Sequence, residues 1–446
     1  MLSNSWSEAN GLNLSSEKSH GASLAERSIL YIAFHYPPIL GSSGVHRTLA
    51  FSRHLSEQGW HVRVLTASLK AYERWAEDQL SFIPGDVEVI RAYARDVSRH
   101  YSWRGRYLAA MALPDNWQSW ILGGVVSGLA SIAKKKPKVI VSTYPVASAH
   151  IIAYVLHRLT GVPWVADLRD PMAQADYPSD PTRKKLFEWI ERKIVKHCRY
   201  AIVTAPGAKA YYQEKFPDSG GEFWKFIPNG FDESLFVGIA KTDNHSTLST
   251  NADRPLVLLH SGVIYPSERD PARLFAALSQ LKSEGRINAT VLEVRLRATG
   301  HDELFARELA ALDIQDLVKL EPTVTYQDAL SEMFAVDGLL LLQAANCNYQ
   351  IPAKAYEYLR VQKPILALTP PDGDTGRLLA NLGVAEIAPL DDTDEIKRAL
   401  STFIAKLQTA SPVTLDEKTL NEHSRQYQAI QLESLLEQFT QTLSGA

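Results

Sequence analysis

Residues 338–368 read GLLLLQAANCNYQIPAKAYEYLRVQKPILAL, and their pattern decides the fold. The continuous apolar run Gly338–Leu342 is typical of a strand that is buried on both faces of a parallel sheet. A polar loop follows, and Pro352 is suited to the start of a helix. The next apolar run, Ile365–Leu368, predicts a second strand. The whole stretch is therefore read as one βαβ unit.

The same alternation recurs from Ser28 onward and predicts two parallel sheets. In the first half, apolar runs fall at residues 29–34, 62–66, 139–142, 164–168 and 200–204, with helical stretches between them. In the second half they fall at 256–261, 291–298, 318–320, 338–342 and 365–368. A chain of 446 residues is long enough for two hydrophobic cores. We expect an α/β protein with two Rossmann-like, doubly wound parallel-sheet domains that face each other across a cleft.

Changes in composition along the chain set the expected domain boundaries. The polar, Ser- and Asn-rich residues 1–27 read as a disordered tail, and the unpatterned residues 237–254 read as a linker or insertion. Between and beyond them lie an N-terminal domain at 28–236 and a C-terminal domain at 255–414. Residues 415–446 are helical without a following strand, so we expect them to pack back on the N-terminal domain.

Composition and charge argue against several classes of protein. A formal net charge of -3 does not suit a nucleic-acid-binding protein. No signal peptide is recognisable, and the longest apolar stretch, Trp117–Ala133, is shorter than the roughly 20 residues of a membrane span. Cys198 and Cys347 are expected to be reduced thiols, and no Cys/His cluster suggests zinc. Asp372-Gly-Asp374 mimics a DxD metal motif, but it follows two prolines in a loop and is assigned to a turn. We expect a cytoplasmic protein, and peripheral contact with the inner face of the membrane stays open.

Two glycines follow the first predicted strand. Gly41 and Gly44 lie just before a helix, so the backbone can approach a ligand closely and free N–H groups can face an anion. The spacing is not that of a dinucleotide-binding loop, and a flexible turn is an equal alternative. Asn229, in the turn PNG at 228–230, is assigned first to turn structure.

A charged cluster follows the strand at 164–168. Asp167 and Asp170 lie three residues apart with Arg169 between them, and carboxylates at this position can orient hydroxyls or move a proton. An internal ion pair that fixes the loop is the alternative. His150 lies on the preceding helix, where a histidine is more often structural.

Further candidates lie in the second half of the chain. Gly262 ends a strand, and Arg269 precedes a helix that begins near Pro271, so its guanidinium could neutralise a diphosphate. Lys354 lies in the first turn of the next predicted helix, where free N–H groups and the helix dipole favour an anion. Glu357, three residues later, shares a face with Lys354 and could accept from two vicinal hydroxyls of a ribose. A surface salt bridge between the two residues is the alternative.

At these residues the chain resembles retaining glycosyltransferases of the GT-B fold, family 4, and more narrowly bacterial members that make surface polysaccharides. The resemblance runs from Ser28 to about Phe439. The ordered segments that carry it are FHYPPILGSSGVHRTLAFSRHLSEQGWHVRVLT, LPDNWQSW, VIVSTYPVASAHIIAYVL, PWVADLRDPM, IPNGFDESLF, LHSGVIYPSERDPARLFAAL and IPAKAYEYLRVQKPILAL.

The resemblance implies which domain does what. The C-terminal domain would hold a nucleotide diphosphate sugar, with Glu357 on the ribose and with Arg269 and Lys354 on the diphosphate, while Gly262 would line the donor site. The base would lie along the main chain near 323–326. Gly41 and Gly44 would approach the donor across the cleft. Neither a cofactor nor a metal would be required.

Two departures from the family pattern matter. Tyr349 stands where the family has a glutamate, so the donor sugar would be held differently, by Asn346, Asn348 and loop amides. Arg169 or Asp170 stands where the family commonly has a histidine. These two residues are our catalytic candidates on the acceptor side, and Arg269 and Lys354 are those on the donor side. Asp167, His150 and Asn229 would support the acceptor site.

The expected function is transfer of a hexose, with retention, from a nucleotide sugar to a saccharide or lipid-linked acceptor in cell-surface polysaccharide synthesis. Two alternatives stay open: a nucleotide-sugar epimerase of the same fold, and a non-catalytic protein that binds a sugar nucleotide.

Overall fold

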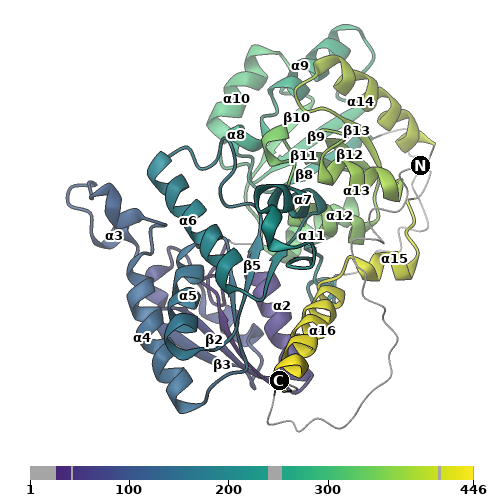
Figure 1. The fold of residues 1–446 in the computed structure, drawn as a ribbon. Coiled ribbons are helices and arrows are strands. Elements are labelled where there is room, and N and C mark those ends of the chain that lie inside the picture. Colours follow the sequence, from purple (N-terminus) through teal and green to yellow (C-terminus); the bar gives the residue numbers. More distant parts are fainter. Residues whose placement is uncertain (1–26, 42–43, 240–253, 410–412, 445–446) are drawn as a thin grey trace. The chain divides into compact units, whose positions relative to one another are not determined.

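The structure is a computed structural model that describes residues 27–41, 44–239, 254–409 and 413–444 (Figure 1). The chain divides into two compact units: unit 1 contains Met1–Asn229 and Arg425–Ala446, and unit 2 contains Gly230–Ser424. The first boundary thus falls after Asn229, where the sequence placed it after residue 236. Most of the tail and of the linker expected at 1–27 and 237–254 lies outside the described residues.

Unit 1 is built on a seven-stranded parallel sheet in the order β3-β2-β1-β4-β5-β6-β7. The order reverses between β1 and β4, as in a doubly wound fold. Its strands are β1 Ser28–Ile32, β2 His61–Ala67, β3 Glu88–Ala92, β4 Val139–Thr143, β5 Trp164–Arg169, β6 Tyr200–Val203 and β7 Trp224–Phe226. Its α-helices are α2 Gly44–Glu57, α3 Val97–His100, α4 Ser119–Lys134, α5 Ser148–Thr160, α6 Pro181–His197, α7 Pro206–Lys215 and α16 Arg425–Ser444.

The C-terminal helix α16 completes the core of unit 1. Leu432, Leu435 and Leu436 of α16 are buried in one cluster with α2 and the strands, although the rest of unit 1 ends at Asn229. Polar contacts fix the register of the helix, since His54 Nε2 lies 2.8 Å from a carboxylate oxygen of Glu433. Each leucine buried in this way contributes about 1.5–3 kcal/mol, so the last helix is part of the fold of unit 1.

Unit 2 contains a six-stranded parallel sheet in the order β10-β9-β8-β11-β12-β13. Here the order reverses between β8 and β11. The strands are β8 Leu256–Ser261, β9 Leu292–Arg297, β10 Val318–Glu321, β11 Gly338–Leu342, β12 Ile365–Leu368 and β13 Ala385–Ala388. The α-helices are α8 Pro266–Arg269, α9 Ala272–Ser283, α10 Asp302–Ala311, α11 Tyr326–Ala335, α12 Ala353–Val361, α13 Asp374–Leu382, α14 Thr393–Gln408 and α15 Glu417–Glu422. The predicted fold class, two doubly wound parallel sheets, is confirmed.

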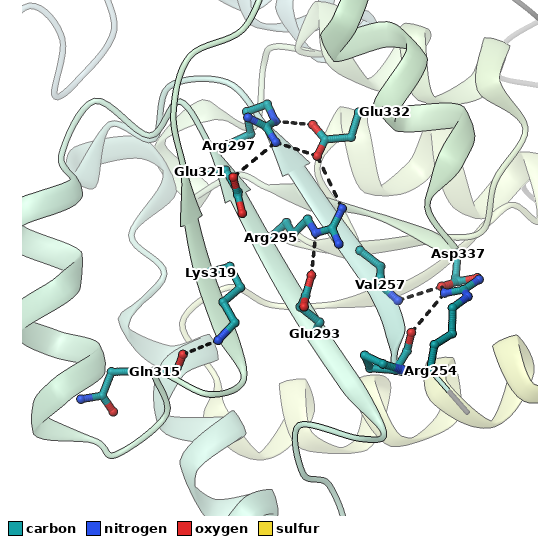
Figure 2. A network of polar contacts seen from close by, with 11 residues as sticks. Arg254, Val257, Glu293, Arg295, Arg297, Gln315, Lys319, Glu321, Glu332 and Asp337 are labelled. Atoms are coloured by element: carbon teal, nitrogen blue, oxygen red, sulfur yellow. Dashed lines mark hydrogen bonds and ion pairs between the residues drawn. The ribbon is translucent and has the colours of Figure 1, made fainter. Parts of the chain in front are cut away.

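A polar network in unit 2 holds α11 against the sheet, as Figure 2 shows. Arg297, at the end of β9, forms an ion pair with Glu332 of α11, and Arg295 of the same strand lies 3.8 Å from that carboxylate. Just beyond α11, Asp337 accepts hydrogen bonds from the Arg254 guanidinium and from the backbone N–H of Val257 at 2.7 and 2.8 Å. These contacts link both α11 and the turn that follows it to the strands.

Two predicted elements differ in detail from the structure. The single helix expected from about Pro271 is preceded by a short helix, α8, that ends at Arg269. The helical stretch expected from residue 415 is divided into α15 and α16, and the break at His423 and Ser424 coincides with the boundary between the units. In the apolar stretch at 117–133, α4 packs closely on α5, since a Cβ on Gly124 would lie 2.5 Å from Cδ1 of Ile152. Over the described ranges, we find no helix with the length and apolar character needed to cross a membrane.

Candidate functional site

The candidate site in unit 2 lies where β8 and β11 separate. These strands pair only at Leu258–Gly338 and Leu259–Leu339, so the carbonyl of Leu340 is left free by the sheet. The ring of His260 lies 3.0 Å from this oxygen through Nδ1, and the hydroxyl of Tyr358 donates to it at 3.2 Å. The gap opens at the carboxyl ends of the strands, where the order reverses, and such a crevice is the usual ligand site of doubly wound sheets.

Lys354 lies at the edge of this gap, in the first turn of α12. Its Nζ lies 3.1 Å from Nε2 of His260. A carbonyl oxygen can only accept, so Nδ1 of His260 carries the ring proton and Nε2 accepts from the lysine. Burial keeps the pKa of His260 well below its usual range, and the charge of Lys354 acts in the same direction. The imidazole is therefore neutral.

Gly262 leaves the room that Lys354 occupies. Its φ of +117° is a conformation that residues with a side chain rarely adopt, and a Cβ there would lie 3.1 Å from the lysine Nζ. The sequence predicted a glycine at the end of this strand as part of the donor site. The structure adds its physical reason, which is space for a lysine from another part of the chain.

The charge on Lys354 is poorly stabilised in the unliganded protein. Burial is the main cause that lowers its pKa to about 7, the nearby positive charge of Arg269 contributes to this shift, and only Glu357 acts in the opposite direction. Arg269 itself donates to the carbonyl of Val263 at 3.1 Å, with its guanidinium 5.7 Å from the ring centre of Tyr265. The structure thus brings together Gly262, Arg269 and Lys354, as predicted, and the two cations would be stabilised by a bound anion.

Glu357 lies one turn after Lys354 on α12. The hydroxyl of Tyr326, at the start of α11, donates to its Oε1 at 2.7 Å. Among the described residues no partner is recorded for Oε2, so this oxygen can accept from a ligand. From the segment 323–326, the sequence predicted only a main-chain contact with the base. The side chain of Tyr326 was missed because it lies 31 residues away and no motif includes it.

The loop before α12 is held mainly by its own hydrogen bonds. Asn346 donates to the carbonyl of Ser267 at 2.9 Å, and Gln343 donates to the carbonyls of Cys347 and Gln350 at 2.7 and 3.0 Å. Asn346 therefore links the loop to α8. Oδ1 of Asn348 is buried and has no partner within the described part of the chain, so it keeps a free acceptor.

In unit 1, Asp167 forms a buried ion pair. Its carboxylate accepts from Nε and Nη2 of Arg47 at 3.0 and 3.1 Å and from the hydroxyl of Thr143 at 2.9 Å. Arg47 also donates to the carbonyls of Ile227 and Pro228. This is the structural alternative considered from sequence, but the partner is Arg47 of α2 and not the adjacent Arg169. Sequence reasoning gave Arg47 no role, since 120 residues separate it from Asp167.

Arg169 and Asp170 lie at the irregular end of β5. Arg169 has a φ of +61°, rare for a residue with a side chain, and the pairing with β6 shifts at this point. Its Nη1 donates to the carbonyl of Tyr144 at 3.2 Å, and its buried Nε has no partner in the described residues. Asp170 accepts from the hydroxyl of Thr204 at 3.3 Å, and burial raises its pKa. Backbone strain of this kind is common at functional sites.

His35, at the end of β1, belongs to the same edge of the sheet. Burial lowers its pKa to about 3, and the charge of Arg169 contributes to this shift. The carboxyl ends of parallel strands meet at one edge, which explains why the charge of Arg169, the last residue of β5, affects the pKa of a residue just after β1. His35 was not among the predicted site residues, although it opens the loop that contains Gly41 and Gly44.

The remaining predicted residues of unit 1 are distributed more widely. His150 is fully buried behind β4, with Nδ1 2.8 Å from the hydroxyl of Ser142, and burial lowers its pKa to about 4, so it contributes to the core. Asn229 is buried, and its Oδ1 has no partner among the residues described. Gly41 has a φ of +79°, and Gly44 begins α2. Their approach to a donor stays a prediction.

Taken together, unit 1 and unit 2 define a protein of the GT-B class, with two doubly wound sheets and, in the second unit, a buried lysine close to an arginine. Residues 43–230 match the family model described as a glycosyl transferase 4-like domain. This match covers less than half of the chain, and it supports the resemblance to family 4 glycosyltransferases seen in the sequence.

Solved structures support the same fold. Sucrose-phosphate synthase from Thermosynechococcus elongatus is 16% identical with a TM-score of 0.66, over 93% of this chain and 100% of that one. HepE from Anabaena, in complex with UDP, is 14% identical with a TM-score of 0.59, over 94% and 100%. A Listeria monocytogenes protein assigned as a UDP-N-acetylglucosamine 2-epimerase is 10% identical with a TM-score of 0.56, over 94% and 97%. A search of curated proteins finds no significant match.

Proposed function

We propose that the protein transfers a sugar from a nucleotide diphosphate sugar to a saccharide or lipid-linked acceptor in cell-surface polysaccharide synthesis, with retention of configuration. The observation that carries this proposal is the cationic pair formed by Arg269 and Lys354 beside Gly262, at the point where β8 and β11 separate. Structures of the same fold hold UDP and UDP-glucose in HepE.

The roles follow from charge and hydrogen bonding. Negative charge grows on the diphosphate as the sugar leaves, and a fixed guanidinium and ammonium stabilise that charge more in the transition state than in the bound substrate. Glu357, oriented by Tyr326, offers the acceptor oxygen that a ribose requires. Arg169 and Asp170, in unit 1, are the acceptor-side candidates, and Asn348 has an unpaired oxygen for a sugar hydroxyl.

Binding and turnover can be tested separately. Thermal shift with UDP-, GDP-, ADP- and dTDP-sugars should identify the donor, because a ligand that binds only the folded protein raises its melting temperature. Lys354→Ala and Glu357→Ala should then lose both the shift and transfer activity. Lys319→Ala is the matched control, since Lys319 on β10 donates to a nearby carbonyl, that of Gln315, and no other partner is recorded for its side chain in the described ranges. Wild-type behaviour of both site variants would remove the donor-site assignment.

The epimerase alternative is favoured by one observation, the likeness to the Listeria protein. Incubation of the protein with its donor alone separates the two reactions. A transferase releases nucleotide slowly by hydrolysis and leaves the remaining donor unchanged, whereas an epimerase yields an interconverted sugar nucleotide. When an acceptor is present, the anomeric coupling constant of the product, measured by NMR, tests retention.

A further inference from the structure

A loop of unit 1 combines exposed aromatic residues with arginines. We call residues 97–110, VSRHYSWRGRYLAA, the aromatic loop. It contains three arginines and no acidic residue, in a chain whose formal net charge is -3. It follows β3 and includes α3, and Figure 1 shows this segment standing out from the rest of unit 1. A local excess of positive charge that opposes the charge of the whole chain calls for an explanation.

The tip of the aromatic loop is a tight hairpin. The backbone N–H of Trp103 donates to the carbonyl of Arg106 at 2.8 Å, and the reverse bond measures 3.0 Å. The two residues between them, Arg104 and Gly105, have φ of +52° and +75°, as a type I′ turn requires. The backbone therefore fixes the shape of the tip.

The hairpin presents apolar side chains to solvent. Trp103 is 76% exposed and Leu108 is 74% exposed. The guanidinium carbon of Arg104 lies 4.9 Å from the centre of the Trp103 ring, so charge and aromatic surface are presented together. Among the described residues, no ion pair or side-chain hydrogen bond is recorded for Arg104 or Arg106.

The base of the aromatic loop is firmly held. Asp96 caps α3 by accepting from the N–H of Arg99 at 3.0 Å, and the Arg99 guanidinium donates to the carbonyl of Ala71 at 2.6 Å. The hydroxyls of Tyr93 and Tyr101 lie 2.6 Å apart. Arg99 is thus used inside unit 1, whereas the arginines at the tip are available to a partner.

We propose that the aromatic loop binds the surface of an anionic lipid bilayer, with Trp103 and Leu108 at the level of the headgroups and Arg104 and Arg106 on lipid phosphates. Tryptophan is favoured at the membrane interface, and arginines near an anionic surface add about 1 kcal/mol each. A second copy of the chain is a poorer partner, because two arginine-rich tips would face each other. Neutral saccharide stacked on Trp103 would leave the guanidiniums without a partner.

The position of the aromatic loop gives this contact a consequence. The loop leaves the carboxyl end of β3, the edge of the sheet that also carries Arg169 and Asp170 at the end of β5. If the transferase activity proposed above is correct, docking would hold this edge close to the bilayer, where a lipid-linked acceptor resides. The lipid contact itself does not depend on that activity.

Flotation with vesicles tests the proposal on the full-length protein. We expect binding to phosphatidylcholine vesicles that contain phosphatidylglycerol, weaker binding as salt rises, and little binding to phosphatidylcholine alone. Arg104→Gln with Arg106→Gln should reduce partitioning about 25-fold, at about fivefold for each charge. Trp103→Ser should reduce it by about tenfold or more. The control, Arg158→Gln with Leu159→Ser, changes an exposed arginine and a 64% exposed leucine at the end of α5 and should bind like wild type.

A second measurement reports insertion directly. Lipids brominated on the acyl chain should quench part of the tryptophan fluorescence of the wild type, and Trp103→Phe should lack that part. The proposal is overturned if the wild type ignores anionic vesicles, if the loop variants bind as well as the control, or if Trp103→Ser abolishes self-association or oligosaccharide binding in place of vesicle binding. Nucleotide release from the donor, measured without lipid, should persist in every loop variant, which distinguishes failure here from failure of the proposed function.

Discussion

Nζ of Lys354 lies 3.1 Å from Nε2 of His260, and the opposite ring nitrogen of His260 faces the carbonyl of Leu340. The histidine is therefore held as a neutral acceptor by a carbonyl that the diverging strands leave free. This arrangement fixes the lysine beside Gly262 without neutralising it by a carboxylate. A cation held in this way is poised to respond to a bound diphosphate.

Donor binding should be coupled to proton uptake. In the free protein the pKa of Lys354 is about 7, so at pH 8 the side chain is mostly neutral. A diphosphate raises this pKa, so binding at pH 8 should take up about one proton, and affinity should fall up to about tenfold per pH unit above pH 7. Calorimetry in buffers of different ionisation enthalpy measures the uptake. Equal uptake by Lys354→Met would contradict this assignment.

The same pKa shift predicts a stability effect of Lys354→Met. The unfolded lysine keeps its ordinary pKa, so between pH 7 and pH 10 it binds more protons than the folded one. The buried charge therefore lowers the stability of the fold fully below pH 7, and this loss of stability declines as the pH rises above 7. The variant should therefore melt at a higher temperature than wild type at pH 6, and the difference should shrink towards pH 9. A difference that grows with pH would show that the lysine stabilises the fold.

Gly262→Ala should impair donor binding more than folding. An alanine at a φ of +117° costs on the order of 1–3 kcal/mol, and its Cβ displaces the ammonium of Lys354. Gly285→Ala is the control, because Gly285 also has a positive φ, +70°, but open space around its Cβ position. Melting temperatures should fall in both variants, while nucleotide affinity should fall about tenfold or more only in Gly262→Ala. Matching losses of affinity would show that backbone strain alone is responsible.

Tyr326→Phe should raise the KM for the donor about two- to tenfold with little change in kcat. The substitution removes the 2.7 Å hydrogen bond to Glu357, and one such bond contributes about 0.5–1.5 kcal/mol. Glu357→Gln should have the larger effect, since it weakens the contact with the ribose itself. Steady-state kinetics with varied donor distinguishes the two. A fall in kcat at constant KM in Tyr326→Phe would place the tyrosine in the chemical step.

Arg47→Met should destabilise unit 1 by about 3–5 kcal/mol, because it leaves the carboxylate of Asp167 buried without its charge partner. Arg47→Met combined with Asp167→Leu should recover part of this loss. Denaturant unfolding of the wild type, both single variants and the double variant measures the coupling. If the double variant loses as much stability as the two single variants together, the hydrogen bonds of Arg47 to Ile227 and Pro228 account for its contribution to stability.

The sequence pattern alone was sufficient to predict the fold and to place two candidate site residues on one face of a helix. The apolar run Gly338–Leu342 and the helix that follows Pro352 are found where expected, and i,i+3 spacing places Lys354 and Glu357 on one face of α12. These features depend on residues within one or two turns of each other. Periodicity and helix geometry therefore determine them locally.

Contacts between distant segments were decided only by the tertiary structure. The pairs His260–Lys354, Tyr326–Glu357 and Arg47–Asp167 are separated by 94, 31 and 120 residues. Strand order brings their elements to the same edge of a sheet, yet which side chains meet depends on where strands diverge, on a glycine that leaves room and on how burial shifts each charge. The sequence thus determined two doubly wound sheets and a cationic helix start, whereas packing within each unit paired Asp167 with Arg47 and lowered the pKa of Lys354.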